Sequence, residues 1–144
     1  GCEYPPLSNW WNCKHIDRIK KVIEECWPGE LTIIFKANEE FTEKFDSGLK
    51  TVGIRIPKNK TAIDIIKNTG GIVLTTSANI SGERAVTDIK DMSEVLLSEV
   101  DGIITDNSIL TGVPSTIIKY VEGEIEILRE GNINIEKIKQ LMKG

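Results

Sequence analysis

Strand and helix patterns alternate along this chain, and proline or glycine stands at several of the boundaries between them. Residues 13–26 carry apolar side chains at helical spacing, and Pro28 and Gly29 end that pattern. An apolar strand pattern follows at once over residues 31–37. Because elements of both kinds must bury their apolar faces together, this order predicts an α/β or α+β fold, with helices packed on a mixed sheet.

Proline or turn residues mark the ends of several later strand patterns. Apolar and polar side chains alternate from Thr51 to Ile56, and Pro57 then ends the run. Glu122 and Gly123 separate the last two strand patterns and predict a hairpin turn. The further predicted strands cover residues 51–56, 72–76, 102–105, 115–121 and 124–129.

Capping residues mark where the later helices begin and end. Thr61 and Asp64 have the spacing of a capping box, and Gly70-Gly71 is a termination signal for the same helix. Asp91 begins a second pattern of the same kind. The further predicted helices cover residues 61–68 and 92–99 and the segment from Asn134 onward, while residues 39–46 fit an amphipathic loop or short helix.

Composition restricts the class of protein. The chain has 144 residues, of which 40% are hydrophobic, so one domain can bury a core without external staples. A formal charge of −4 argues against a uniformly basic surface. Three cysteines without a Cys-x-x-Cys pair predict reduced thiols and no metal site. No apolar run is long enough for a membrane span or signal peptide, so we expect no membrane partner and a cytoplasmic location.

The segment from Thr75 to Gly82 combines a predicted strand end with small polar side chains. It follows the apolar run Ile72-Val73-Leu74 and reads Thr-Thr-Ser-Ala-Asn-Ile-Ser-Gly. Serine and asparagine side chains donate hydrogen bonds while occupying little volume, which suits phosphate or carboxylate oxygens. We therefore expect a polar binding pocket at the carboxyl end of this strand.

Three further segments place hydroxyl or cationic groups at the ends of predicted strands. They cover residues 27–32, 113–116 and 128–131. Each has an ordinary explanation when taken alone: Pro-Gly is a turn, Ser-Thr begins a strand, and a strand arginine usually makes a surface ion pair. Their meaning comes from their occurrence together and in a fixed order.

Taken together, these segments resemble the YrdC-like family of threonylcarbamoyl-AMP synthases. The resemblance covers about residues 27–131 and follows the family's order of motifs. It implies a twisted, open sheet around a deep cavity. The matching motifs are Trp27-Pro28-Gly29-Glu30-Leu31-Thr32, Val52-Gly53-Ile54-Arg55-Ile56-Pro57, Thr76-Ser77-Ala78-Asn79-Ile80-Ser81-Gly82, Pro114-Ser115-Thr116 and Leu128-Arg129-Glu130-Gly131.

The resemblance also implies an activity. Family members condense ATP, L-threonine and bicarbonate into threonylcarbamoyl-adenylate and release pyrophosphate. Separate transferase proteins then use this product to modify an adenosine beside the tRNA anticodon. Adenylyl transfer requires neutralised phosphate charge, so it calls for arginine, usually Mg²⁺ and oriented hydroxyl donors more than for a proton-shuttling histidine.

The site residues implied by the resemblance come from several motifs, and none is given a catalytic role. Asn79 and Arg129 are the residues expected to lie on the nucleotide side. The full set is Thr32, Asn79, Thr87 and Arg129 for ATP, Ser77 and Ser115 for threonine or carbamate, and Arg55, Ser81 and Lys36 as weaker candidates.

The amino-terminal residues depart from the family pattern. Family members carry a Pro-Thr-x-Thr-x-Tyr-Gly-Leu motif and a Lys-x-Arg motif upstream of Trp-Pro-Gly, and residues 1–26 contain neither. We therefore expect one YrdC-like domain over residues 1–144 that is incomplete at its amino end. A non-catalytic module that binds nucleotide, tRNA or double-stranded RNA is the alternative function. A carbamoyltransferase domain of hydrogenase maturation ranks last, because no acylphosphatase-like or zinc-finger element accompanies it.

Overall fold

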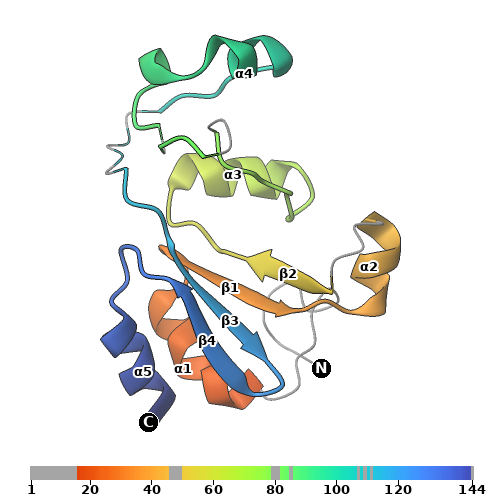
Figure 1. The fold of residues 1–144 in the computed structure, drawn as a ribbon. Coiled ribbons are helices and arrows are strands. Elements are labelled where there is room, and N and C mark those ends of the chain that lie inside the picture. Colours follow the sequence, from red (N-terminus) through yellow and green to blue (C-terminus); the bar gives the residue numbers. More distant parts are fainter. Residues whose placement is uncertain are drawn as a thin grey trace.

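A computed structural model describes residues 16–45, 50–78, 82–84, 86–106, 108, 110 and 112–143. Strands and helices are mixed along it, as the sequence pattern predicts (Figure 1). The elements are α1 (Ile16–Cys26), β1 (Leu31–Lys36), α2 (Glu39–Phe45), β2 (Thr51–Ile54), α3 (Lys60–Asn68), η2 (Ile89–Asp91), α4 (Glu94–Glu99), β3 (Thr116–Val121), β4 (Glu124–Arg129) and α5 (Ile135–Lys143).

The strands form one open, mixed sheet in the order β2-β1-β3-β4. The central strands β1 and β3 are parallel, and Ile33 lies beside Ile118 in their register. The outer strands β2 and β4 run antiparallel to their neighbours. This arrangement confirms the predicted α/β class with an open sheet of mixed direction.

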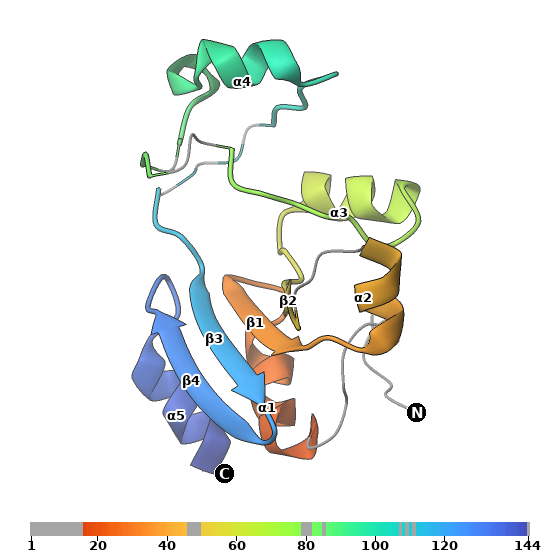
Figure 2. The same ribbon diagram turned by 45° about the vertical axis from the view of Figure 1, so that its right-hand side comes forward.

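The hydrophobic core lies between one face of this sheet and two helices. Burial alternates along β1 and β3, so every second side chain faces the core. Ile33 and Ile118 are fully buried in the centre of the sheet, and Ile19 of α1 and Ile138 of α5 are fully buried against it. Figures 1 and 2 show α5 beside α1, and α1 lies behind β3 and β4. The opposite face of the sheet therefore has neither of these helices on it.

The chain between β2 and β3 leaves the sheet and forms α3, η2 and α4, which lie beyond one edge of it (Figure 1). None of these helices contains a buried residue. The strands predicted over residues 72–76 and 102–105 are wrong, because the structure has no strand there. Both runs are apolar, but within the part of the chain that the structure describes neither pairs with another strand. Leu74 is 66% exposed and Ile104 is 68% exposed.

Two of the predicted helix caps are wrong. Asn59, and not Thr61, caps α3, because its side-chain oxygen accepts a hydrogen bond from the Ala62 amide at 2.9 Å. The helix predicted over residues 92–99 is shortened to α4, since Asp91 belongs to the preceding turn η2, which Asp88 caps. The side chain of Asn59, two residues before Thr61, competes successfully for the free amides of the first turn.

Other local predictions are confirmed. Positive φ angles of 106° at Gly70 and 93° at Gly71 follow the end of α3. Glu122 and Gly123, with φ angles of 53° and 79°, form the two-residue turn between β3 and β4. Asn134 accepts a hydrogen bond from the Glu136 amide at 2.7 Å and so begins α5. Among the described residues, no helix has the length and apolar content needed to cross a bilayer.

Candidate functional site

Four matched motifs meet at a single edge of the sheet. Because β1 and β3 are parallel and their outer neighbours run the opposite way, β1 and β3 begin where β2 and β4 end. Thr32 is the second residue of β1, Ser115 precedes β3, Arg55 follows β2 and Arg129 ends β4. The edge is the amino end of the parallel pair, whereas the sequence pattern predicted a pocket at the carboxyl end of a strand over residues 72–76.

A pair of hydroxyl groups lies at the centre of this edge. The oxygens Oγ1 of Thr32 and Oγ of Ser115 are 3.0 Å apart, although the two residues are 83 positions apart in the chain. Ser115 is 8% exposed, and Thr32 is half-buried beside it. One hydroxyl donates to the other, so the accepting hydroxyl still has its own proton to donate. The pair can therefore hold a ligand oxygen.

Arg129 brings a positive charge beside this hydroxyl pair. Its Nε and Nη2 atoms donate to the carbonyl oxygen of Ser115 at 3.1 Å and 2.9 Å. A carbonyl is neutral, so these bonds orient the guanidinium without cancelling its charge. Within the described part of the chain, no carboxylate forms an ion pair with Arg129. The neighbouring Glu130 instead accepts from the Ile135 amide at the start of α5, at 3.0 Å.

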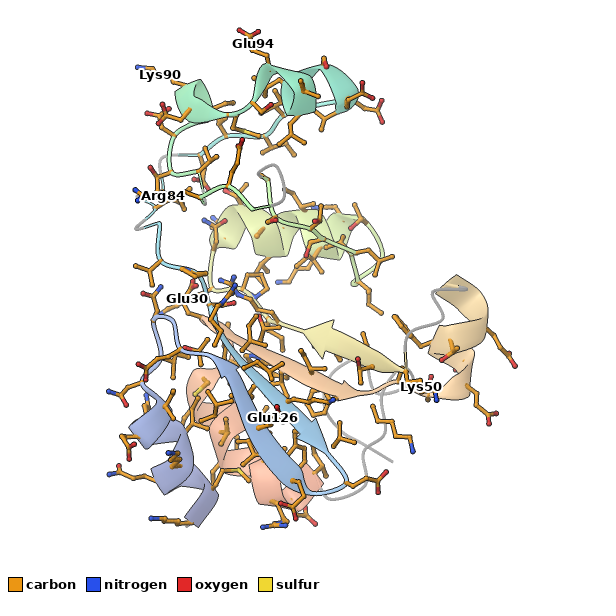
Figure 3. The ribbon with its side chains drawn as sticks, in the orientation of Figure 1. Glu30, Lys50, Arg84, Lys90, Glu94 and Glu126 are labelled. Carbon is orange, nitrogen blue, oxygen red and sulfur yellow. The ribbon has the colours of Figure 1, made fainter. Side chains whose placement is uncertain are left out.

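Arg55 occupies the same edge but is engaged differently. Its Nη2 atom lies 2.8 Å from the Glu30 carboxylate, and its Nε atom donates to the Gly29 carbonyl at 3.0 Å. The Gly29 amide in turn donates to the Ile56 carbonyl at 2.8 Å. Figure 3 shows Glu30 at the edge of the sheet that faces α3. Arg55 therefore clamps the Pro28-Gly29 turn, and its charge is paired. The sequence reasoning missed Glu30, although it lies inside a matched motif.

The remaining predicted residues lie elsewhere or outside the described residues. Ser77 and Thr87 are exposed in the segment between β2 and β3, and no hydrogen bond joins either to Thr32 or Ser115 among the described residues. A Cβ added at Gly112 would lie 3.1 Å from the Thr87 methyl group, so Thr87 is near the loop that leads to Pro114. The residues with other placements are Lys36, which lies at the opposite end of β1 and pairs with Glu122 at 3.4 Å, and Asn79 and Ser81, which lie outside the described residues.

A polar cluster also connects α3 with the loop before β3. Asp106 accepts hydrogen bonds from the side chain and the amide of Ser108 and from the Asn59 side chain, the last two at 2.8 Å and 3.1 Å. These donors stabilise the ionised carboxylate and lower the pKa of Asp106 from 3.8 to about 2. The cluster therefore ties the start of α3 to the loop that leads to Ser115.

The titration of Asp106 tests this cluster. Because its pKa is depressed in the folded chain, the stabilisation is present above pH 3.8 and is lost as the pH falls toward 2. We expect the carboxyl ¹³C shift of Asp106 to titrate with a midpoint of about 2. Ser108→Ala should move that midpoint upward by more than Asn59→Ala, because Ser108 provides the largest contribution. A midpoint of 3.8 in the unmodified chain would contradict the cluster.

The chain is similar to a family of known proteins. The Sua5/YciO/YrdC family model, described as "Telomere recombination", matches residues 7–131. The chain is 30% identical over 116 residues to the threonylcarbamoyl-AMP synthase of Pyrococcus abyssi, covering 81% of this chain and 34% of that protein. It is 28% identical over 127 residues to the threonylcarbamoyl-AMP synthase of Bacillus subtilis strain 168, covering 88% of this chain and 37% of that protein.

A solved structure extends the similarity to the fold. The crystal structure of Pyrococcus abyssi Sua5 complexed with L-threonine superposes with a TM-score of 0.76 at 28% identity. The match covers 87% of this chain and 37% of that protein. The chain thus spans just over a third of the length of these relatives. Because the family model matches most of the chain and the fold agrees, the chain belongs to the Sua5/YciO/YrdC family.

Proposed function

We propose that this chain is part of an L-threonylcarbamoyladenylate synthase. The observation that carries the proposal is the meeting of Thr32, Ser115 and Arg129 at one sheet edge, although they come from three separate family motifs. Family membership supports the proposal, as do the names of the relatives, threonylcarbamoyl-AMP synthases. The complex of a related protein with L-threonine supports threonine as a substrate.

The proposed reaction joins ATP, L-threonine and bicarbonate and yields threonylcarbamoyl-adenylate, pyrophosphate and water. A carbamate oxygen attacks the α-phosphorus of ATP, and the bond to the pyrophosphate oxygen breaks. Negative charge develops on the departing pyrophosphate, so the reaction needs fixed positive charge beside the phosphates. The guanidinium of Arg129, which forms no ion pair with any described carboxylate, is suited to that task because it is oriented by a neutral carbonyl.

The hydroxyl pair supplies the polar contacts in this proposal. Thr32 is assigned to the nucleotide side and Ser115 to threonine or its carbamate, and their 3.0 Å separation puts both within reach of one ligand. Ser77, Asn79 and Thr87 complete the assignment, with Ser77 on the threonine side. Arg55 and Ser81 remain weaker assignments, and Lys36 is not assigned to this site because it lies at the opposite end of β1.

Magnesium would enter this reaction as the counterion of ATP. The described residues contain no group of three or more histidine, cysteine or acidic side chains that could hold a metal ion. Mg²⁺ is usually bound by substrate phosphates with one or two carboxylates, and a protein cage is then unnecessary. The product would serve tRNA threonylcarbamoyladenosine modification by separate transferase proteins in the cytoplasm.

Pyrophosphate release tests the proposal. The complete product of the gene that encodes this chain is assayed with ATP, L-threonine, bicarbonate and Mg²⁺, and each substrate is omitted in turn. We expect release that requires both threonine and bicarbonate. ATP binding without any threonine-dependent turnover would instead support the alternative, a module that binds nucleotide or double-stranded RNA.

A further inference from the structure

We infer that Thr116 and Gly131 are positioning residues, which lock the turn after β4 onto the start of β3 and thereby hold Arg129 beside the Ser115–Thr32 hydroxyl pair. The inference deepens the proposed function and rests on it for its ligand. Neither residue is assigned a ligand contact. Their role is to fix the place of one guanidinium.

The Thr116 hydroxyl joins the start of β3 to the turn after β4 by hydrogen bonds. Thr116 is fully buried, and its Oγ1 atom accepts hydrogen bonds from the amides of Gly131 at 2.9 Å and Ile133 at 3.0 Å. The same hydroxyl donates to the Ile133 carbonyl at 2.7 Å. One donor and two acceptor positions are the whole capacity of a hydroxyl, so this group is saturated by the turn that follows Arg129.

The backbone of Gly131 also packs closely against the residues that begin β3. A Cβ atom added at this position would lie 2.7 Å from the Ser115 carbonyl carbon and 2.8 Å from the Thr116 amide nitrogen, and it would overlap the Pro114 carbonyl oxygen. These atoms belong to the backbone and cannot rotate away. The two turns therefore approach so closely that only glycine fits at residue 131.

These contacts between the turn after β4 and the start of β3 also fix the position of Arg129 in the candidate site. Arg129 lies two residues before Gly131 and bonds the Ser115 carbonyl, while Ser115 itself precedes Thr116. The Thr116 amide also donates to the Glu30 carbonyl at 3.0 Å, which ties the start of β3 to the start of β1. A small movement of the turn after β4 would separate Arg129 from Ser115. Because a guanidinium binds anions through fixed donor directions, its orientation decides the strength of the contact.

The test compares Thr116→Val, which keeps the shape and removes the hydroxyl, with Thr116→Ser, which keeps the hydroxyl. In the ¹H–¹⁵N spectrum we expect Thr116→Val to release the Arg129 Nε–H from slow exchange with water, and Thr116→Ser to retain its protection. ATP affinity, measured by calorimetry, should fall at least about tenfold in Thr116→Val and stay within about twofold in Thr116→Ser.

Ile138→Val in the α5 core is the control for general destabilisation, because it lies outside the site and should lower stability without moving Arg129. An Arg129 Nε–H that stays protected in folded Thr116→Val overturns the inference. If Thr116→Val does not fold, hydrogen exchange in the unmodified chain tests the inference instead. The Nε–H of Arg129 and the amides of Gly131 and Ile133 should then exchange at similar rates, because they open together. Much faster exchange of the Arg129 Nε–H alone overturns the inference. If the unmodified chain binds no ATP while Arg129 responds as expected, the positioning role stands and the proposed function fails.

Discussion

Gly131→Ala is expected to lower the free energy of unfolding by about 3 kcal/mol or more. This is the largest loss of stability that we predict for a substitution in this chain. The added carbon would lie within 2.8 Å of three backbone atoms, the Pro114 carbonyl oxygen, the Ser115 carbonyl carbon and the Thr116 amide nitrogen. Relief requires the turn after β4 to move away from β3. That movement breaks the hydrogen bonds from Gly131 and Ile133 to the buried Thr116 hydroxyl, which adds the cost of unsatisfied polar groups.

Gly53→Ala is the matched control for Gly131→Ala. Gly53 lies in β2, where an added Cβ would be 3.6 Å from the Thr32 methyl group and 3.8 Å from Ile34, at ordinary contact distance. Glycine within a strand is less stable than alanine by about 0.5–1 kcal/mol, so this change should be neutral or stabilising. Urea unfolding followed by circular dichroism measures both. Equal destabilisation by the two variants would contradict the close approach of the two turns.

Arg129→Gln is expected to weaken ATP binding by about ten- to a hundredfold, because it removes the positive charge assigned to the phosphates. The same change at Arg55 should have a smaller effect, since the Glu30 carboxylate already pairs with that guanidinium at 2.8 Å. The contrast depends on charge pairing alone, as both arginines lie at the same sheet edge and both donate to a backbone carbonyl.

Arg18→Gln provides a control of the same chemistry at a distant position. Arg18 donates to the carbonyl of Gly123 at 2.9 Å, in the hairpin turn at the opposite end of the sheet. Its replacement should leave ATP affinity within about twofold, the change expected when no contact to the ligand is lost. Calorimetric titration with Mg-ATP measures the loss of affinity in each of the three variants, which we expect to be largest for Arg129→Gln, smaller for Arg55→Gln and smallest for Arg18→Gln. Similar losses for Arg18→Gln and Arg129→Gln would remove the assignment of Arg129 to the nucleotide.

The parts of the fold that sequence patterns predicted well are local. The hairpin at Glu122-Gly123 and the end of α3 at Gly70-Gly71 depend on a few neighbouring residues with special backbone angles, and both are confirmed. The predicted strands over residues 72–76 and 102–105 depended on apolar character alone. A strand also needs a partner for its backbone groups, and no pattern within a short window shows whether one is available.

The candidate site shows the same limit of sequence reasoning. Thr32 and Ser115 were each expected near a ligand, yet their hydrogen bond joins residues 83 positions apart and follows only from the parallel pairing of β1 and β3. Thr116 and Glu30 stood inside matched motifs without a role, because burial and ion pairing depend on the packed structure. A family motif thus identifies the segments that meet, and the fold decides which side chains face the ligand and which hold the others in place.

Threonine-dependent release of pyrophosphate tests the central claim most directly. The complete gene product, with ATP, bicarbonate and Mg²⁺ present, is assayed with and without L-threonine, and Arg129→Gln is assayed in parallel. We predict that release requires threonine and that Arg129→Gln reduces it at least about tenfold. Release that is independent of threonine, or that is unchanged in Arg129→Gln, would contradict a synthase site built on Thr32, Ser115 and Arg129.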